Sequence, residues 1–128
     1  MRWGRKYWDH LGPVIDESSF GDLKACPAAF GGYQLLRQQA LAEGIARLGN
    51  LHLVISAVAY DARNEELMKC ISGSTGLSDI KSDWGSLFRG EAKFRTFTHQ
   101  AWVRWVKEAD TSGYWDGWAA YITDRYGF

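Results

Sequence analysis

The chain has 128 residues, of which 46% are hydrophobic and 23% charged, and its formal net charge at pH 7 is zero. This composition excludes a disordered chain, and the neutral charge argues against strong non-specific binding to nucleic acid, which usually needs a basic domain. The length is close to the commonest size of one domain, so we expect a single domain over residues 1–128. Low net charge also favours association with a partner.

The sequence carries no sign of export or of membrane insertion. Its first six residues lack the apolar segment of a signal peptide, and the longest apolar run, residues 51–60, is too short to span a membrane. Cys26 and Cys70 are therefore expected to be free thiols in a reducing compartment. We expect a cytoplasmic protein that does not associate with membranes.

The first predicted element is a helix from Tyr33 to Leu48, because apolar residues recur there every three or four positions. Residues 1–32 are predicted to be irregular or a weak hairpin. Gly49-Asn50 supplies the helix stop. Gly44 inside the helix is either a tolerated weakness or a sign of close packing against a sheet. Glu43 and Arg47 are expected to pair on another face. The predicted apolar surface comprises Tyr33, Leu36, Ala40, Leu41, Ile45 and Leu48.

The next element, Leu51 to Tyr60, is almost continuously apolar, which is typical of a strand buried on both faces in a helix-covered sheet. A central strand needs hydrogen-bonded neighbours on both edges. The chain offers the alternating segment Lys93–Phe97 and only a weak second candidate, Val14–Ile15. Because two strands rarely form a stable sheet in water, we expect an α/β or α+β fold with a small, incomplete central sheet flanked by helices.

The rest of the chain is predicted to be mainly helical, with each helix beginning near a residue that can cap it. A loop rich in Gly, Ser and Thr occupies residues 72–79. The tryptophans of the last two helices are expected to face the core rather than to stack on bases. These tryptophans are Trp102, Trp105, Trp115 and Trp118. The predicted helices run from Asn64 to Cys70, from Ser82 to Phe88, from Thr98 to Ala109 and from Tyr114 to Tyr126.

Complete catalytic motifs are absent from the sequence. The three histidines are far apart and lack the spacing of metal ligands, so no zinc site is expected. Three acidic-x-Lys triplets occur, and about two are expected from composition alone. Such a triplet is catalytic on a strand beside a second acidic residue, where the carboxylates hold Mg²⁺ and the lysine orients or activates the attacking water.

The triplet that comes nearest to this arrangement is Asp22-Leu23-Lys24, because Asp16 precedes it and a helix follows. Asp22 and Lys24 are therefore candidate catalytic residues, and Asp16 and Asp22 are candidate Mg²⁺ ligands. The alternative is a solvated turn with no catalytic role.

The helix start Gly31-Gly32-Tyr33-Gln34-Leu35-Leu36-Arg37-Gln38-Gln39, followed by the apolar strand, resembles the PD-(D/E)XK nuclease superfamily, in particular a group of bacterial restriction-endonuclease-like proteins. In that superfamily an acidic residue and an acidic-x-Lys triplet lie on a hairpin. A helix with a Gln-Leu element and a buried strand follow. The segments 60–64 and 97–102 are also similar to those proteins, and the resemblance covers most of residues 30–110.

The resemblance implies a restriction-endonuclease-like fold, DNA as partner and Mg²⁺-dependent hydrolysis of phosphodiester bonds. It implies that Gln34 lies near the active centre, where it contacts a phosphate or a metal-bound water, and that Arg37 and Gln38 help to hold the DNA backbone. In the family the acidic-x-Lys strand lies farther upstream of the helix than Asp22 does here. The joint interpretation is therefore the C-terminal half of a nuclease-like domain.

The residues leave three hypotheses open. The first is a restriction-endonuclease-like domain or truncated remnant, which binds DNA in its complete form and lacks the full catalytic motif here. The second is a complete small nuclease that uses Asp16, Asp22, Lys24 and Gln34. The third is a non-catalytic interaction module, whose open sheet edge and aromatic helices dock a partner chain or a second copy by strand addition.

Overall fold

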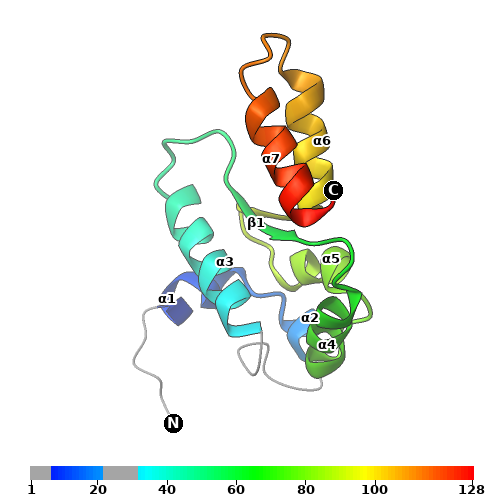
Figure 1. The fold of residues 1–128 in the computed structure, drawn as a ribbon. Coiled ribbons are helices and arrows are strands. Elements are labelled where there is room, and N and C mark those ends of the chain that lie inside the picture. The colour runs from blue at the N-terminus through cyan, green and yellow to red at the C-terminus, as the bar shows by residue number, and fades with distance from the viewer. Residues whose placement is uncertain (1–6, 22–31) are drawn as a thin grey trace. The chain divides into compact units, whose positions relative to one another are not determined.

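A computed structural model describes residues 7–21 and 32–128 of the chain, which are mainly helical with one small sheet (Figure 1). This mixture of helices and strands agrees with an α+β protein. In chain order the elements are α1 (Tyr7–Leu11), the 3₁₀ turn η1 (Gly12–Val14), α2 (Glu17–Gly21), α3 (Gly32–Ala46), β1 (Ile55–Tyr60), α4 (Glu65–Thr75), α5 (Ile80–Asp83), the 3₁₀ turn η2 (Trp84–Leu87), β2 (Lys93–Thr98), α6 (His99–Ala109) and α7 (Asp116–Tyr126).

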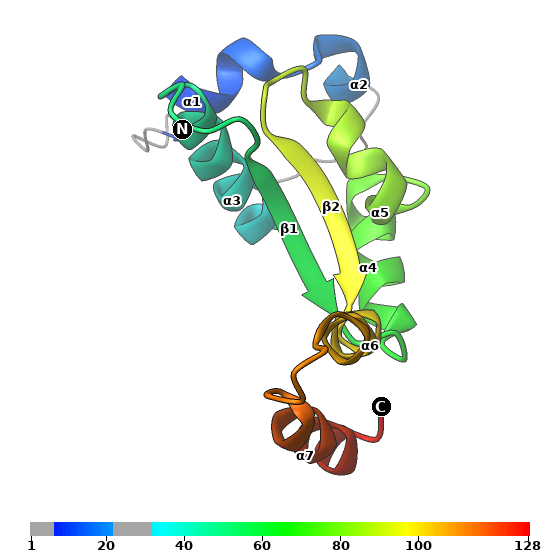
Figure 2. The same cartoon turned by 90° about the horizontal axis from the view of Figure 1, so that it is seen from above.

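The sheet of the described residues consists of β1 and β2, which lie side by side and run in the same direction (Figure 2). Parallel neighbours need a long crossover, and the chain between these strands supplies α4, α5 and η2. The weak strand candidate Val14–Ile15 does not join this sheet. Ile15 forms an isolated antiparallel bridge with Phe88 instead.

The predicted burial of β1 on both faces is wrong. The strand begins at Ile55 rather than Leu51, and its residues alternate between exposed and more buried positions. Leu51, Leu53 and Ile55 are 59%, 61% and 47% exposed. An apolar run indicates burial only when neighbouring elements cover it, and the described residues supply one strand partner and leave these three side chains open to solvent.

The chain divides into two compact units, which we describe separately. The first comprises Met1–Ala57 and Glu65–Arg95, and the second comprises Val58–Asn64 and Thr96–Phe128. Each strand therefore gives its first three residues to the first unit and its last three to the second. A single domain over residues 1–128 stays a prediction.

In the first unit, α3 forms as predicted and ends before Gly49, whose φ of +69° favours glycine. The predicted apolar surface is only partly correct, because Leu41 and Leu48 are exposed while Gln39 and Glu43 are completely buried. The helix turns its small residues toward the strands, where Ala42 and Ala46 pack with Ala92 and Val54.

Two further predictions about α3 are corrected by its neighbours. A Cβ at Gly44 would lie 3.6 Å from the ring of His10 in α1, so this glycine faces a helix rather than the sheet. Glu43 does not pair with Arg47. The Arg47 Nη2 donates to the His10 carbonyl oxygen at 2.6 Å, and Glu43 accepts from Gln39.

Downstream of β1, two predicted helix boundaries move. α4 continues past Cys70 to Thr75, into the predicted loop. Asp79 rather than Ser82 caps α5, since its carboxylate accepts from the Lys81 backbone N–H at 3.0 Å. The turn η2 then buries Trp84 completely, with its ring centroid 6.2 Å from that of Phe94 on β2.

The helices of the second unit form where the sequence predicts them. The Thr98 hydroxyl oxygen accepts from the Ala101 N–H at 3.0 Å and so caps α6, which ends at Ala109. α7 ends at Tyr126, and Gly127 takes up a φ of +69° as its C-cap. The start of α6 and the end of α7 are thus set by residues next to them in the sequence.

Candidate functional site

Asp16, a predicted Mg²⁺ ligand, lies at the start of α2. Its Oδ1 accepts hydrogen bonds from the Ser18 hydroxyl at 2.5 Å and the Ser19 N–H at 3.1 Å, and its Oδ2 pairs with the Arg89 guanidinium. The Ser18 and Ser19 hydrogen bonds, and then the Arg89 bond, hold the pKa of Asp16 well below its usual range. A Mg²⁺ ion could bind this carboxylate only if Arg89 moved away.

The other predicted site residues lie on α3 or outside the described residues. Asp22 and Lys24 belong to residues 22–31, which the structure does not describe. Gln34, Arg37 and Gln38 share α3 and are exposed. Gln34 and Gln38, four residues apart, lie on one face of the helix. Arg37 borders a shallow apolar pocket of about 420 Å³ that α1 and α3 share.

Metal-binding clusters do not occur in residues 7–21 and 32–128. No group of three or more His, Cys, Asp or Glu side chains is placed there to hold an ion. The Mg²⁺ site therefore stays a prediction, because Asp22 lies outside these ranges.

A polar cluster stands at the carboxyl ends of the two parallel strands, which meet at one edge of a sheet. Asp61 follows β1, and Gln100 lies two residues beyond β2. The Gln100 Nε2 donates to the Asp61 Oδ1 at 2.8 Å, while its Oε1 accepts from the Ala62 N–H at 3.0 Å. The amide thus joins the turn after β1 to the first turn of α6.

Arg63 completes this cluster. Its guanidinium donates to both carboxylate oxygens of Asp61, at 2.9 and 2.6 Å, and also to the Tyr126 carbonyl oxygen at 2.9 Å. The Arg63 and Gln100 hydrogen bonds hold the pKa of Asp61 well below its usual range. Both carboxylate oxygens are engaged, so the cluster fastens chain segments and offers no free base. The sequence interpretation assigned it no role, although both segments directly follow strands.

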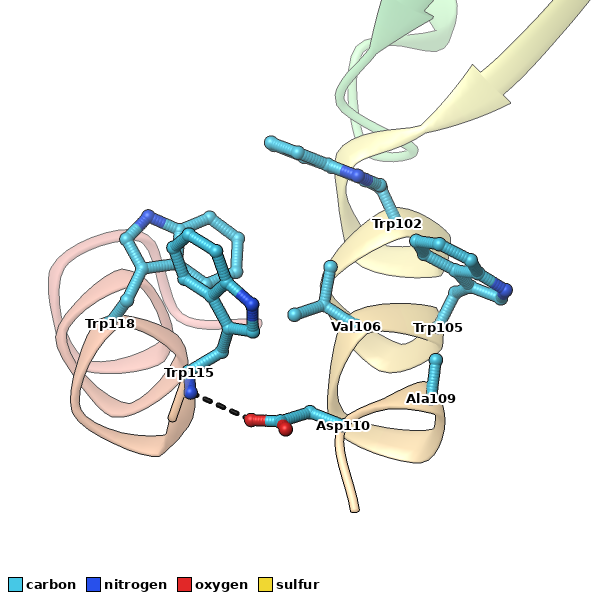
Figure 3. A pocket seen from close by; sticks show the side chains of 7 residues that line it. All are labelled: Trp102, Trp105, Val106, Ala109, Asp110, Trp115 and Trp118. Atoms are coloured by element: carbon cyan, nitrogen blue, oxygen red, sulfur yellow. Dashed lines mark hydrogen bonds between the residues drawn. The ribbon is translucent and has the colours of Figure 1, made fainter. Parts of the chain in front are cut away.

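The second unit contains a groove of about 510 Å³ between α6 and α7 (Figure 3). The prediction that its tryptophans belong to the core is wrong for Trp102, Trp105 and Trp115, which are 44%, 63% and 49% exposed, whereas Trp118 is half-buried. A stripe of large apolar residues on a helix predicts a covered face, but α6 and α7 cover only part of each other's stripe. The residues that line the groove are Trp102, Trp105, Val106, Ala109, Asp110, Trp115 and Trp118.

The tryptophan rings of the groove are ordered by edge-to-face contacts. The ring centroids of Trp102 and Trp118 are 5.3 Å apart at 68°, and those of Trp115 and Trp118 are 6.2 Å apart at 79°. The Asp110 Oδ2 accepts from the Trp115 N–H at 2.7 Å and so fixes the start of α7 (Figure 3). The groove therefore has aromatic walls of defined geometry.

Two further findings concern the chain as a whole. Among the described residues, no helix has the length and apolar character needed to cross a membrane. Comparison of the chain with protein-family models, with curated proteins and with solved structures gives no match.

Proposed function

We propose that this protein is a restriction-endonuclease-like domain of the PD-(D/E)XK type, which binds DNA and, with its complete sheet, hydrolyses it in the presence of Mg²⁺. The observation that carries the proposal is the order of the elements. α3 begins two residues before Gln34, the parallel strand β1 follows, and β2 passes at Thr98 directly into α6. The resemblance at Gln34-Leu35 implies this same order.

Exposed apolar residues at and just before the start of β1 also support the proposal of a larger, nuclease-like sheet. Parallel strands occur almost only in sheets that are covered on both faces, and a two-stranded sheet is rarely stable in water. Ile55 at the start of β1, and Leu51 and Leu53 in the segment that precedes it, are nevertheless exposed. A further strand and the elements it brings would cover these residues, as in the larger sheet of a nuclease domain.

In the proposed domain, α3 would face the DNA. Gln34 would contact a phosphate or a metal-bound water, and Arg37 and Gln38 would hold the phosphate backbone. Their exposure on one helix leaves them free to do so. Asp22 and Lys24 would supply the acidic and basic groups of the reaction, and Mg²⁺ would stabilise the charge that develops on the phosphate.

The purified protein is expected to bind duplex DNA and, where Asp22 and Lys24 complete the site as in the complete small nuclease, to nick supercoiled plasmid with Mg²⁺ but not with EDTA. Lys24→Ala should lower the cleavage rate by about 100-fold or more, because the reaction loses the group that orients the water. Gln34→Ala should reduce cleavage with little loss of DNA binding. Lys81→Ala is the matched control, because the triplet Asp79-Ile80-Lys81 lies at the start of α5 rather than on a strand. This variant should cleave DNA like the wild type.

Two results would decide against parts of this proposal. DNA binding without cleavage would identify an inactive remnant of a nuclease domain. The absence of both binding and cleavage would contradict the proposal as a whole.

A second candidate function, a non-catalytic interaction module, is favoured by the open β1. Two copies related by a two-fold axis could pair their β1 strands and form a four-stranded sheet, a size at which sheets are commonly stable. The exposed Leu51 and Leu53 would then pack across the axis, and the zero net charge would not oppose the approach. β1 is thus a docking edge for a second copy of this chain.

Light scattering after gel filtration is expected to give the mass of a dimer. Leu53→Lys should shift it to the monomer, because the substitution places a charge in the new interface. Leu41→Lys on α3, at a similarly exposed leucine outside the segment that leads into β1, should leave the dimer intact. A wild-type monomer at high protein concentration would argue against strand addition between copies.

A further inference from the structure

We propose that the groove between α6 and α7 binds the quaternary ammonium group of a small choline-type ligand. The proposal rests on the walls of the groove, on its charge and on its size, and it is independent of the nuclease proposal. The seven described residues that line the groove belong to the second unit of the chain (Figure 3).

The walls of the groove present aromatic surface to a ligand. In an edge-to-face pair each ring keeps at least one face out of the contact, so the pairs Trp102–Trp118 and Trp115–Trp118 leave indole faces available. The exposure of Trp102 and Trp115 shows that solvent reaches these rings. Indole is the aromatic group that attracts cations most strongly, and quaternary ammonium ligands are recognised by such aromatic surfaces.

The charge of the groove selects among apolar ligands. Among the described residues that line the groove, Asp110 is the one ionisable group, and none is a lysine or an arginine. Hydrogen bonds from the Ser112 hydroxyl and the Trp115 N–H lower the pKa of Asp110, so its carboxylate is ionised at neutral pH. An anion would be repelled, and a neutral hydrocarbon would gain nothing from this charge. A methylated cation gains from both the carboxylate and the indole faces.

The size of the groove fits a whole small ligand. Its volume of about 510 Å³ lies within the usual range of ligand pockets, roughly 300–1,000 Å³. A trimethylammonium group fills only part of this space, which leaves room for the hydroxyethyl or ester portion of a choline-type molecule.

Titration of the protein with choline, followed by tryptophan fluorescence and by calorimetry, tests the proposal. We expect saturable binding with a Kd on the order of 1 mM. The neutral analogue 3,3-dimethyl-1-butanol has the same shape without the charge and should bind at least about ten-fold more weakly. Equal affinity for the two compounds would overturn the proposal, since the groove would then select only for apolar surface.

Variants locate the binding in the groove. Trp115→Ala should abolish saturable binding. Asp110→Asn keeps an oxygen that accepts from the Trp115 N–H, gives up the acceptor of the Ser112 N–H, and should raise the Kd about ten-fold because the groove loses its charge. Tyr121→Ala, an exposed aromatic of α7 outside the groove, should leave the Kd unchanged. Circular dichroism verifies that each variant is folded.

Two outcomes of these variants would overturn the proposal. One is an unchanged Kd in Trp115→Ala, which would place the ligand elsewhere on the protein. The other is tighter binding of a peptide bearing trimethyl-lysine than of choline, which would overturn the assignment to a small ligand.

Discussion

Replacing Gly90 with alanine is expected to lower the free energy of unfolding by about 3 kcal/mol. A Cβ at this position would overlap both carboxylate oxygens and the carboxylate carbon of Glu43, which is completely buried on α3. Glu43 is held in place by Gln39, whose Nε2 donates to its Oε1 at 3.1 Å, and by the Glu91 N–H, which donates to its Oε2 at 3.2 Å. The new methyl group can fit only if the carboxylate leaves these donors.

The overlap has two costs. Overpacking a well-packed site costs about 1–3 kcal/mol. A buried carboxylate that loses a donor adds the cost of an unsatisfied polar group, again about 1–3 kcal/mol. Gly90 is therefore required by the close approach of its backbone to Glu43, and not by a turn conformation.

Urea unfolding followed by far-UV circular dichroism measures this effect. Gly73→Ala in α4 is the matched control, because nothing lies within 4 Å of its added Cβ, and it should stabilise the helix by about 0.5–1 kcal/mol. In a Glu43→Ala background the cost of Gly90→Ala should largely disappear, since neighbouring substitutions are not additive. A Gly90→Ala protein as stable as the wild type would disprove the close contact between Gly90 and Glu43.

Truncation of Trp84 to alanine is expected to cost about 4 kcal/mol, the second large effect. Its side chain is completely buried, and its ring centroid lies 5.8 Å from that of Phe88 and 6.2 Å from that of Phe94. Phe88 in turn makes an edge-to-face contact with Phe20 of α2, at 5.9 Å. Removing the indole would leave a large cavity at the centre of this cluster.

Trp105→Ala is the matched control, because the same substitution at a 63% exposed tryptophan should cost less than about 0.5 kcal/mol. Thermal and urea unfolding of both variants would measure the difference. Trp84→Phe gives a second test if the alanine variant fails to fold. The Trp84 Nε1 is buried and has no hydrogen-bond partner among the described residues, so phenylalanine should cost only about 1 kcal/mol. Equal losses for Trp84→Ala and Trp105→Ala would contradict the burial of Trp84.

Local signals in the sequence predict the end of α3 and the boundaries of α6 and α7. Thr98 can cap a helix through its own hydroxyl, and Gly49 can take up a positive φ, whatever the rest of the fold does. The starts of β2 and α6 follow from such signals. Asp79 was missed as a cap because Ser82 is an equally good capping residue by type, and only the backbone geometry decides between them.

The candidate site could be predicted only in part. Gln34, Arg37 and Gln38 share one helix because their spacing requires it. The pairing of Asp16 with Arg89 joins residues that are 73 positions apart, and no local sequence pattern predicts it. The same holds for Asp61 and Gln100, which the parallel pairing of β1 and β2 brings together.

The sequence alone predicts α3, β2, α6 and α7, because helix periodicity, capping and glycine stops act over a few residues. It predicts no helix in residues 1–32, where the structure has α1 and α2, so that prediction of an irregular segment or weak hairpin is wrong for residues 7–21. Only the tertiary structure decided what covers the elements. Glu43 is buried, Leu53 just before β1 is exposed, and the tryptophan stripes of α6 and α7 line an open groove. The physical reason is that burial depends on which distant segments pack against an apolar stripe, and the stripe looks the same whether its neighbour is present or not.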